Sequence, residues 1–178
     1  MKIGKNITYG GIIAAVYAAL CYALWPVAFG PVQFRIAEGL TLLPLILPGS
    51  VMGLFIGCIL ANLSSPYFIL DVIFGSLATL IGAVGTFLIG KRIKNERLKL
   101  ALAPLPPIIS NTIIIGGVLT YMAAAEGEAV TFAVIAGQIA LSEIAACYGV
   151  GIVVLYAVRR AMTGWQSRAE TKKGGDTL

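Results

Sequence analysis

The sequence contains no histidine among its 178 residues. Histidine is the commonest general base and the commonest metal ligand, so hydrolytic and zinc sites of the usual kinds are excluded. The three cysteines, Cys21, Cys58 and Cys147, lie far apart in apolar stretches and form no CxxC pair. We expect them to behave as small buried hydrophobic residues. With no nucleophile–base arrangement either, the sequence indicates no enzyme, metal site or cofactor.

Charged residues are also scarce. They make up 12% of the chain, whereas 58% of its residues are hydrophobic and its mean hydropathy is +0.92. A soluble domain has about 25% charged residues, and a core of this size could not bury so much apolar surface. The composition therefore predicts an integral membrane protein. The net charge of +5 is no sign of nucleic-acid binding, because the chain lacks interleaved basic and aromatic residues.

Basic residues are missing from most of the chain. Twelve of the thirteen Lys and Arg residues fall into three blocks, at 2–5, 91–99 and 159–173, and the thirteenth is Arg35. Such blocks mark the cytoplasmic side of a membrane protein, which leaves Arg35 on the opposite face. The first apolar stretch is longer than the hydrophobic part of a signal peptide, so we expect it to be retained as a helix.

The apolar stretches can be counted as membrane spans. A span needs about 20 apolar residues. Clear candidates lie at 7–27, 70–90, 100–124 and 130–158. Between Glu38 and Asp71, 32 uncharged residues could form one span or two. Two spans are needed here if the basic block at 91–99 is to lie on the same side of the membrane as the N-terminus. Pro44 and Pro48 also interrupt the stretch where a turn between two short helices would be needed.

We therefore predict an all-α membrane protein with six transmembrane helices and both termini in the cytoplasm. The two short helices are expected at 36–47 and 51–63. Residues 1–163 form one domain in this interpretation. The polar tail at 164–178 is expected to be cytoplasmic and disordered.

Several polar residues interrupt the apolar spans. Ionisable groups inside a membrane are costly and therefore indicate function. Glu143 has 14 uncharged residues before it and 15 after it, which places it near mid-membrane. Asn111 falls at a similar depth, and Gln138 and Tyr121 lie nearer the outside, so these side chains could line a pocket open to the exterior. The alternative is a hydrogen bond between Asn111 and Glu143 that only joins two helices. The two glutamates of the 124–131 loop are expected to be solvated.

The outer loops carry a second group of polar residues. Phe34, Arg35 and Glu38 lie at the start of the first short helix, and Asn62 and Asp71 flank the next outer loop. Arg35 and Glu38 are three residues apart, so they could equally form a simple ion pair on the surface of a helix. Asp71 could equally serve only as a partner of a helix dipole.

The first helix carries two rows of small residues. One row is Gly10, Ala14 and Ala18, and the neighbouring row is Gly11, Ala15 and Ala19. Small residues four apart let helices approach closely in lipid. The rows could bind a partner protein or could pack inside the same chain.

One apparent nucleotide motif is excluded. Residues 85–92, GTFLIGKR, nearly match GxxxxGK[ST], but the last position is Arg. The hydroxyl that would hold Mg²⁺ is therefore missing, and the glycines fall in an apolar span.

Two loop segments resemble a known family. VQFRIAEGL at 32–40 and NLSSP at 62–66, which leads to DVIFG at 71–75, are similar to the QueT family, and the resemblance covers about residues 5–160. It implies a substrate-binding S component of an energy-coupling factor (ECF) transporter in the bacterial cell membrane. Such a subunit captures a solute outside and docks on a transmembrane coupling subunit driven by two ATPases. The small-residue rows of the first helix would be the docking face.

The resemblance also implies a deazaguanine ligand, in an aminomethyl or cyano form or as queuine. A guanine edge presents adjacent N–H donors that suit a carboxylate. Ligand contacts are expected from Glu143, Asn111 and Gln138 at the ring edge, from Phe34, Tyr67 or Trp25 by stacking, and from Glu38 or Asp71 toward an amine. Arg35, Asn62 and Tyr121 complete the expected site.

Other functions stay open at this point. An S component for another vitamin has the same architecture. A secondary carrier in which Glu143 shuttles protons is a further alternative, although no inverted repeat is visible. A membrane scaffold that uses the small-residue rows only for assembly is the third, and it would bind no small solute.

Overall fold

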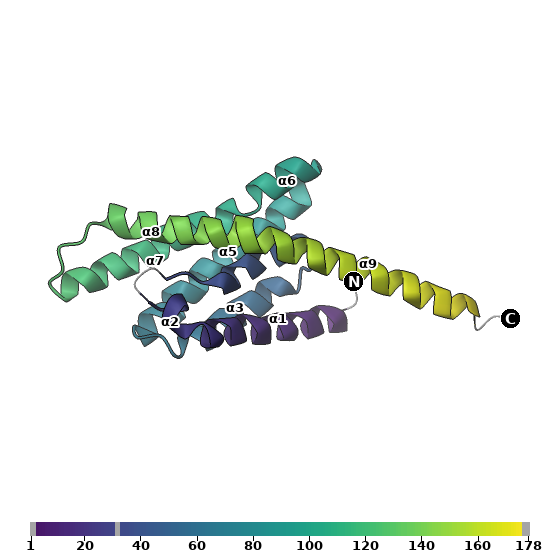
Figure 1. Cartoon of the computed structure of the whole chain (residues 1–178), viewed down its shortest axis with the longest axis horizontal. Helices are drawn as coiled ribbons and strands as arrows, with labels where there is room; N and C mark the ends of the chain where they lie inside the picture. The colour runs from purple at the N-terminus through teal and green to yellow at the C-terminus, as the bar shows by residue number, and fades with distance from the viewer. Residues whose placement is uncertain (1–2, 31–32, 176–178) are drawn as a thin grey trace.

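The computed structural model describes the backbone at 3–30 and 33–175 and the side chains at 4–30 and 33–164. Within these ranges the chain consists of helices and their connections, with no strand (Figure 1). The basic residue Lys2 and the side chains of Arg168, Lys172 and Lys173 lie outside the described part.

The six segments predicted as spans are all helical. Four helical stretches are long and apolar enough to cross a membrane: Gly4–Ala23, Phe68–Arg92, Glu96–Ala125 and Phe132–Gly164. Two shorter apolar helices, Ile36–Leu45 and Ser50–Asn62, lie between the first two. The helices are α1 (Ile3–Ala23), α2 (Trp25–Ala28), η1 (Ile36–Leu45), α3 (Ser50–Asn62), α4 (Phe68–Leu70), η2 (Asp71–Gly75), α5 (Ser76–Arg92), α6 (Glu96–Leu102), α7 (Leu105–Ala125), α8 (Phe132–Ile144), η3 (Ala145–Gly151) and α9 (Ile152–Gly175).

Large apolar side chains cover the outside of the bundle. Ile7, Leu141 and Val153 are 70%, 71% and 67% exposed, and many others are about half exposed. A soluble protein rarely exposes apolar patches of this extent, whereas a bilayer is a suitable solvent for them. Together with the long apolar helices, this surface identifies a multi-pass membrane protein.

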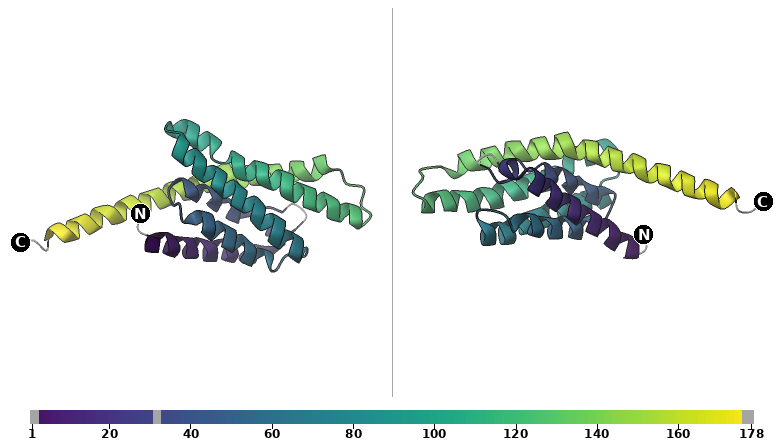
Figure 2. Two further views of the ribbon diagram at one scale, coloured as in Figure 1. Left: turned by 180° about the vertical axis from the view of Figure 1, so that it is seen from behind. Right: turned by 60° about the horizontal axis from the view of Figure 1, so that its bottom comes forward.

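Successive helices run in alternating directions between two ends of the bundle. The N-terminus and the end of α9 lie toward the same end, and the connections after α2, after α3 and between α7 and α8 lie at the other (Figures 1 and 2). Arg159 of α9 forms an ion pair of 3.1 Å with Glu96, which precedes α7. The basic blocks at 91–99 and 159–173 therefore meet at one end.

The short helix η1 lies at the centre of the bundle. Every residue from Ala37 to Pro44 is buried, although the segment has only ten residues. It is a 3₁₀ helix, which rises about 2.0 Å per residue against about 1.5 Å in an α-helix. Its backbone comes very close to η3, because a Cβ on Gly39 would lie 3.0 Å from the Gly151 nitrogen. Glycine at both positions permits this contact.

The two small-residue rows of α1 have different environments. Gly10, Ala14 and Ala18 are buried, whereas Gly11, Ala15 and Ala19 are exposed. The buried row packs on α3, where a Cβ on Gly53 would lie 2.4 Å from the Gly10 oxygen and one on Gly57 2.9 Å from the Ala14 oxygen. The expectation that both rows form a docking face is therefore wrong for the first, which holds α1 against α3.

The last helix is longer than expected. The final span was placed at 130–158, but α9 continues to Gly175. The tail at 164–178 thus begins as helix rather than as disordered chain, and residues 176–178 lie outside the described part. Propagating an existing helix adds one hydrogen bond for each residue fixed, and this segment contains several good helix formers, including Ala169, Glu170 and Lys172.

We predict that Gly53→Ala destabilises the protein by about 1–3 kcal/mol, because the new methyl group would force α1 and α3 apart. The matched control is Gly11→Ala, since a Cβ there meets nothing within 4 Å. Thermal unfolding of both variants in detergent measures the difference. Equal unfolding temperatures would show that α1 and α3 are not held by this contact.

Candidate functional site

Six polar residues on or next to the apolar helices have buried side chains. Arg35, Glu38, Asn62, Asp71, Asn111 and Glu143 are each 7% exposed or less. We call these residues the buried polar network. They come from η1 and the residue before it, α3, η2, α7 and α8. All six were expected at the site from the sequence.

Glu38 lies at the centre of the bundle on η1 and is 1% exposed. The Tyr17 hydroxyl of α1 donates a short hydrogen bond to its Oε1, and the Thr79 hydroxyl of α5 lies 3.4 Å from the same atom. Its Oε2 has no hydrogen-bond partner among the described residues. The carboxyl group thus joins three helices and keeps one free acceptor.

Arg35 is paired with Asp71. Its Nη2 lies 3.9 Å from Asp71 Oδ2, and both side chains are buried. The guanidinium also lies over the Phe29 ring, 4.9 Å from its centroid, and Ser65 donates a short hydrogen bond to Asp71. The alternative of a surface ion pair between Arg35 and Glu38 is therefore wrong. Both residues face the interior, where each has a partner from another segment.

Asn62 links this pair to Glu38. Its Nδ2 donates to the Asp71 carbonyl oxygen at 2.7 Å and to Cys58 Sγ at 3.3 Å. The Thr79 hydroxyl, whose one hydrogen can serve either Glu38 Oε1 or Cys58 Sγ, lies 3.3 Å from that sulfur. The cysteines are buried and free, as expected, but Cys58 takes part in a polar network rather than in purely apolar packing.

Glu143 and Asn111 form the other half of the network. Asn111 Nδ2 donates to Glu143 Oε1 at 3.0 Å, so the helix-to-helix hydrogen bond considered from the sequence exists. The thiol of Cys147 lies 3.8 Å from Glu143 Oε2 and 3.7 Å from the Glu38 carbonyl oxygen. The Cys147 thiol therefore lies between the Glu143 side chain and the backbone of η1 at Glu38.

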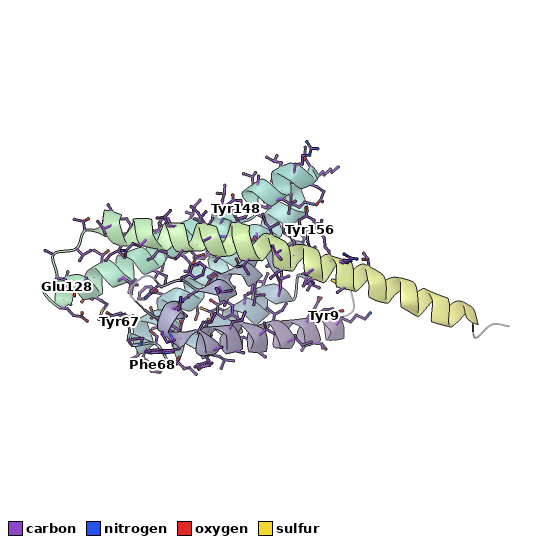
Figure 3. All side chains as sticks on the ribbon, in the orientation of Figure 1. Tyr9, Tyr67, Phe68, Glu128, Tyr148 and Tyr156 are labelled. Atoms are coloured by element: carbon purple, nitrogen blue, oxygen red, sulfur yellow. The ribbon has the colours of Figure 1, made fainter. Side chains whose placement is uncertain are left out.

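A cavity of about 570 Å³ opens beside this network, at the end of the bundle opposite the chain termini. Its walls come from the loops after α2 and α3 and from facing parts of α7 and α8. Lining residues include Phe29, Gln33, Tyr67, Leu119, Gln138 and Ile139. Figure 3 shows Tyr67 and Glu128 toward this end.

None of the six network residues is among the lining residues described, but several of their neighbours are. Ile139 precedes Glu143 by one helical turn, Leu119 follows Asn111 by two turns, and Phe29 contacts Arg35. Gln33 lines the cavity, and its carbonyl oxygen accepts from Ser142, the neighbour of Glu143, at 3.4 Å. Its φ of 45° is left-handed, a conformation that costs a non-glycine residue about 1–3 kcal/mol and occurs mainly at functional sites.

Some expected residues lie elsewhere. Tyr121 is 70% exposed and lines a separate apolar groove with Phe74. The Trp25 indole donates to the Ser64 carbonyl oxygen at 3.0 Å. Phe34 is half-buried, and Phe29 occupies the cavity wall instead.

The two loop glutamates, Glu126 and Glu128, are exposed as expected, and they also line the cavity. A linear pattern does not show that they line it, because this depends on how α7 and α8 are arranged in space.

Sequence reasoning missed three residues that hold the network: Tyr17, Phe29 and Thr79. Tyr17 offered a signal, since it follows Gly10 by seven residues and Ala14 by three and so shares the face that packs on α3. The others are ordinary residues in apolar helices or loops, and only their neighbours in space give them a role.

We predict that Tyr17→Phe lowers stability by about 1–3 kcal/mol, because it removes a donor from a buried carboxyl group. Tyr22→Phe is the matched control, since Tyr22 also lies on α1 and donates to a backbone oxygen of α3, that of Leu60, from an exposed position. Thermal unfolding in detergent compares them. An equal loss of stability in Tyr22→Phe and Tyr17→Phe would show that the hydrogen bond to Glu38 stabilises the protein no more than the exposed one to a backbone oxygen does.

The comparisons with known proteins address the identity of the chain. A family model described as QueT transporter matches residues 7–160, a range that contains the whole buried polar network. Searches of curated proteins and of solved structures give no match. The resemblance carried by the two loop segments is thereby confirmed, and the chain belongs to the QueT transporter family.

Proposed function

We propose that this protein is the substrate-capture S component of an ATP-driven ECF importer, and that it binds a deazaguanine from outside the bacterial cell. Membership of the QueT transporter family implies transport of a queuosine precursor. The observation that carries the proposal is a buried polar network, rich in carboxyl groups, whose neighbours line a cavity at one end of a membrane bundle.

In this proposal all six helical segments cross the membrane and both termini are cytoplasmic. Two observations support it. The helices run in alternating directions, and Glu96, which lies within the 91–99 block, forms an ion pair with Arg159 of the last basic block. The cavity then faces the exterior. Helices η1 and α3 are short, so the connecting residues at their ends complete the crossing of the membrane.

The cavity suits a small heterocycle. Its volume of about 570 Å³ is within the ~300–1,000 Å³ of small-molecule sites. Glu143 receives two donors on its two oxygens, Asn111 Nδ2 and Cys147 Sγ. The adjacent N–H groups of a guanine-type edge can replace them in the same arrangement. Gln138, Tyr67 and Phe29 line the cavity and would hold the ring there.

The partners in this proposal are a transmembrane coupling subunit and two ATPases. The exposed row of Gly11, Ala15 and Ala19 lies next to the exposed apolar residues Ile12 and Val16. Such a face allows close approach of a second helix. ATP hydrolysis then belongs to the partner chains, since this chain lacks a usable nucleotide motif.

We predict that a deazaguanine co-purifies with the protein in detergent and is identified by mass spectrometry. Glu143→Gln should weaken binding of that ligand about tenfold or more, because a charge-assisted hydrogen bond is lost. Gln is nearly isosteric, so unfolding temperature controls for packing. Recovery of a different vitamin, or unchanged affinity in Glu143→Gln, would argue against this ligand assignment.

We predict that Ala15→Leu abolishes ATP-dependent uptake without weakening ligand binding, because it blocks the exposed row. Ala14→Leu, one residue away on the buried row, should instead destabilise the protein itself. Uptake in vesicles and binding in detergent separate the two effects. Uptake that continues without the ATPases and stops when the proton gradient is removed would favour a proton-coupled carrier.

A further inference from the structure

Four basic side chains without a carboxylate partner lie where α5 ends and α6 begins. Residues 91–99 contain five basic residues and one acidic residue, Glu96, which leaves a net charge of +4. Glu96 already pairs with Lys99 at 2.6 Å and with Arg159 at 3.1 Å. The other four basic residues are exposed, and none forms an ion pair with another described residue: Lys91, Arg92, Lys94 and Arg97. We call these four residues the basic corner.

An exposed apolar stripe of α5 leads to the basic corner. Its residues recur at intervals of three and four and are each between 39% and 48% exposed: Leu77, Ile81, Val84 and Leu88. The same spacing, continued beyond Leu88, reaches Lys91 and Arg92 in the last turn of α5. The basic side chains therefore continue the face that the apolar residues begin.

A second apolar stripe leads to the same corner from α7. Helices α6 and α7 belong to one helical stretch, Glu96–Ala125. Its exposed or half-buried apolar residues also recur at intervals of three and four: Leu98, Leu102, Leu105 and Ile109. Arg97 and Lys94 lie just before Leu98, at the end of this stripe. Both stripes are the kind of surface that faces lipid chains, and both end at unpaired positive charge.

The backbone of this corner is held by hydrogen bonds. Asn95 Oδ1 accepts from the backbone N–H groups of Arg97 and Leu98 at 3.0 and 3.3 Å. The Tyr148 hydroxyl donates to the Ala101 carbonyl oxygen at 2.6 Å and so joins η3 to α6. Figure 1 shows α6 at the edge of the bundle, where a lipid can reach it. A segment that is already ordered loses less freedom on binding.

We propose that the basic corner binds the phosphate group of an anionic membrane lipid, whose acyl chains lie along the apolar stripes. Lys and Arg side chains donate N–H groups to phosphate oxygens, and Arg can do so through two parallel bonds. A soluble anion would use the charges but not the stripes, which favours a lipid. With the topology proposed above, this end faces the cytoplasm, whose membrane leaflet attracts basic segments near its surface. The lipid surface is independent of the ligand cavity.

The test measures lipid binding to the full-length protein in neutral detergent by native mass spectrometry. Phosphatidylglycerol and phosphatidylcholine with identical acyl chains are compared, so that only the headgroup differs. We expect phosphatidylglycerol to bind about tenfold or more tightly, because each Lys or Arg near the headgroup contributes about fivefold in affinity. Equal binding of the two lipids would overturn the proposal and leave the proposed function standing.

Matched double variants locate the effect. Lys94→Gln/Arg97→Gln should remove most of the preference for phosphatidylglycerol and leave binding of phosphatidylcholine within about threefold of the parent. The control is Lys5→Gln/Arg160→Gln, which also removes one exposed Lys and one exposed Arg, but outside the basic corner. An equal loss of preference in the control would show that net charge alone attracts the lipid, and the proposal would be wrong.

Two further outcomes would assign the basic corner to another partner. Displacement of phosphatidylglycerol by millimolar inorganic phosphate would identify a site for a soluble anion. A corner variant that binds both lipids like the parent but no longer assembles with a coupling subunit would identify a contact with an acidic protein. Either result contradicts the lipid site. Should the corner variant fail to fold, the comparison of the two lipids on the parent still decides.

Discussion

The structure depends on the burial of one carboxyl group at the centre of a membrane bundle. Glu38 is 1% exposed on a helix whose residues from Ala37 to Pro44 are all buried. A polar group without a donor in such a place costs several kcal/mol, so the surrounding helices must supply donors. Tyr17 of α1 and Thr79 of α5 do so. The positions of these helices around η1 follow from that requirement as much as from apolar packing.

Irregular helices occur where the acidic residues are. Glu38 lies on the 3₁₀ helix η1, Asp71 begins the π-helix η2, and the π-helix η3 begins two residues after Glu143. Single π turns are frequent at functional sites, because they turn side chains away from the regular pattern. Here the three segments that carry these irregular turns also carry the buried carboxyl groups. Gly39 and Gly151 allow η1 and η3 to touch at their backbones, and larger residues would separate them.

Adjacent small-residue rows on α1 serve different purposes. The row on the α3 side is used within the chain, and the other remains on the surface. In the proposed function the chain has to fold and still present a face to a coupling subunit, and one helix with two such rows would meet both needs. The polar network and the docking face then lie on opposite sides of α1, because Tyr17 shares the buried face. Tyr17 therefore connects the helix proposed for docking with the proposed ligand site.

The sequence by itself determined the membrane class, the six helical segments and the six buried polar residues. Hydropathy and the positions of basic blocks are properties of the linear chain, and the cost of polar groups in lipid makes residues such as Glu143 visible there. The pairing of those residues was decided by the tertiary structure. Arg35 meets Asp71 rather than Glu38, and Glu126 and Glu128 line the cavity. Partner choice depends on the rotation of each helix and on local 3₁₀ and π geometry, which an average α-helical period does not encode.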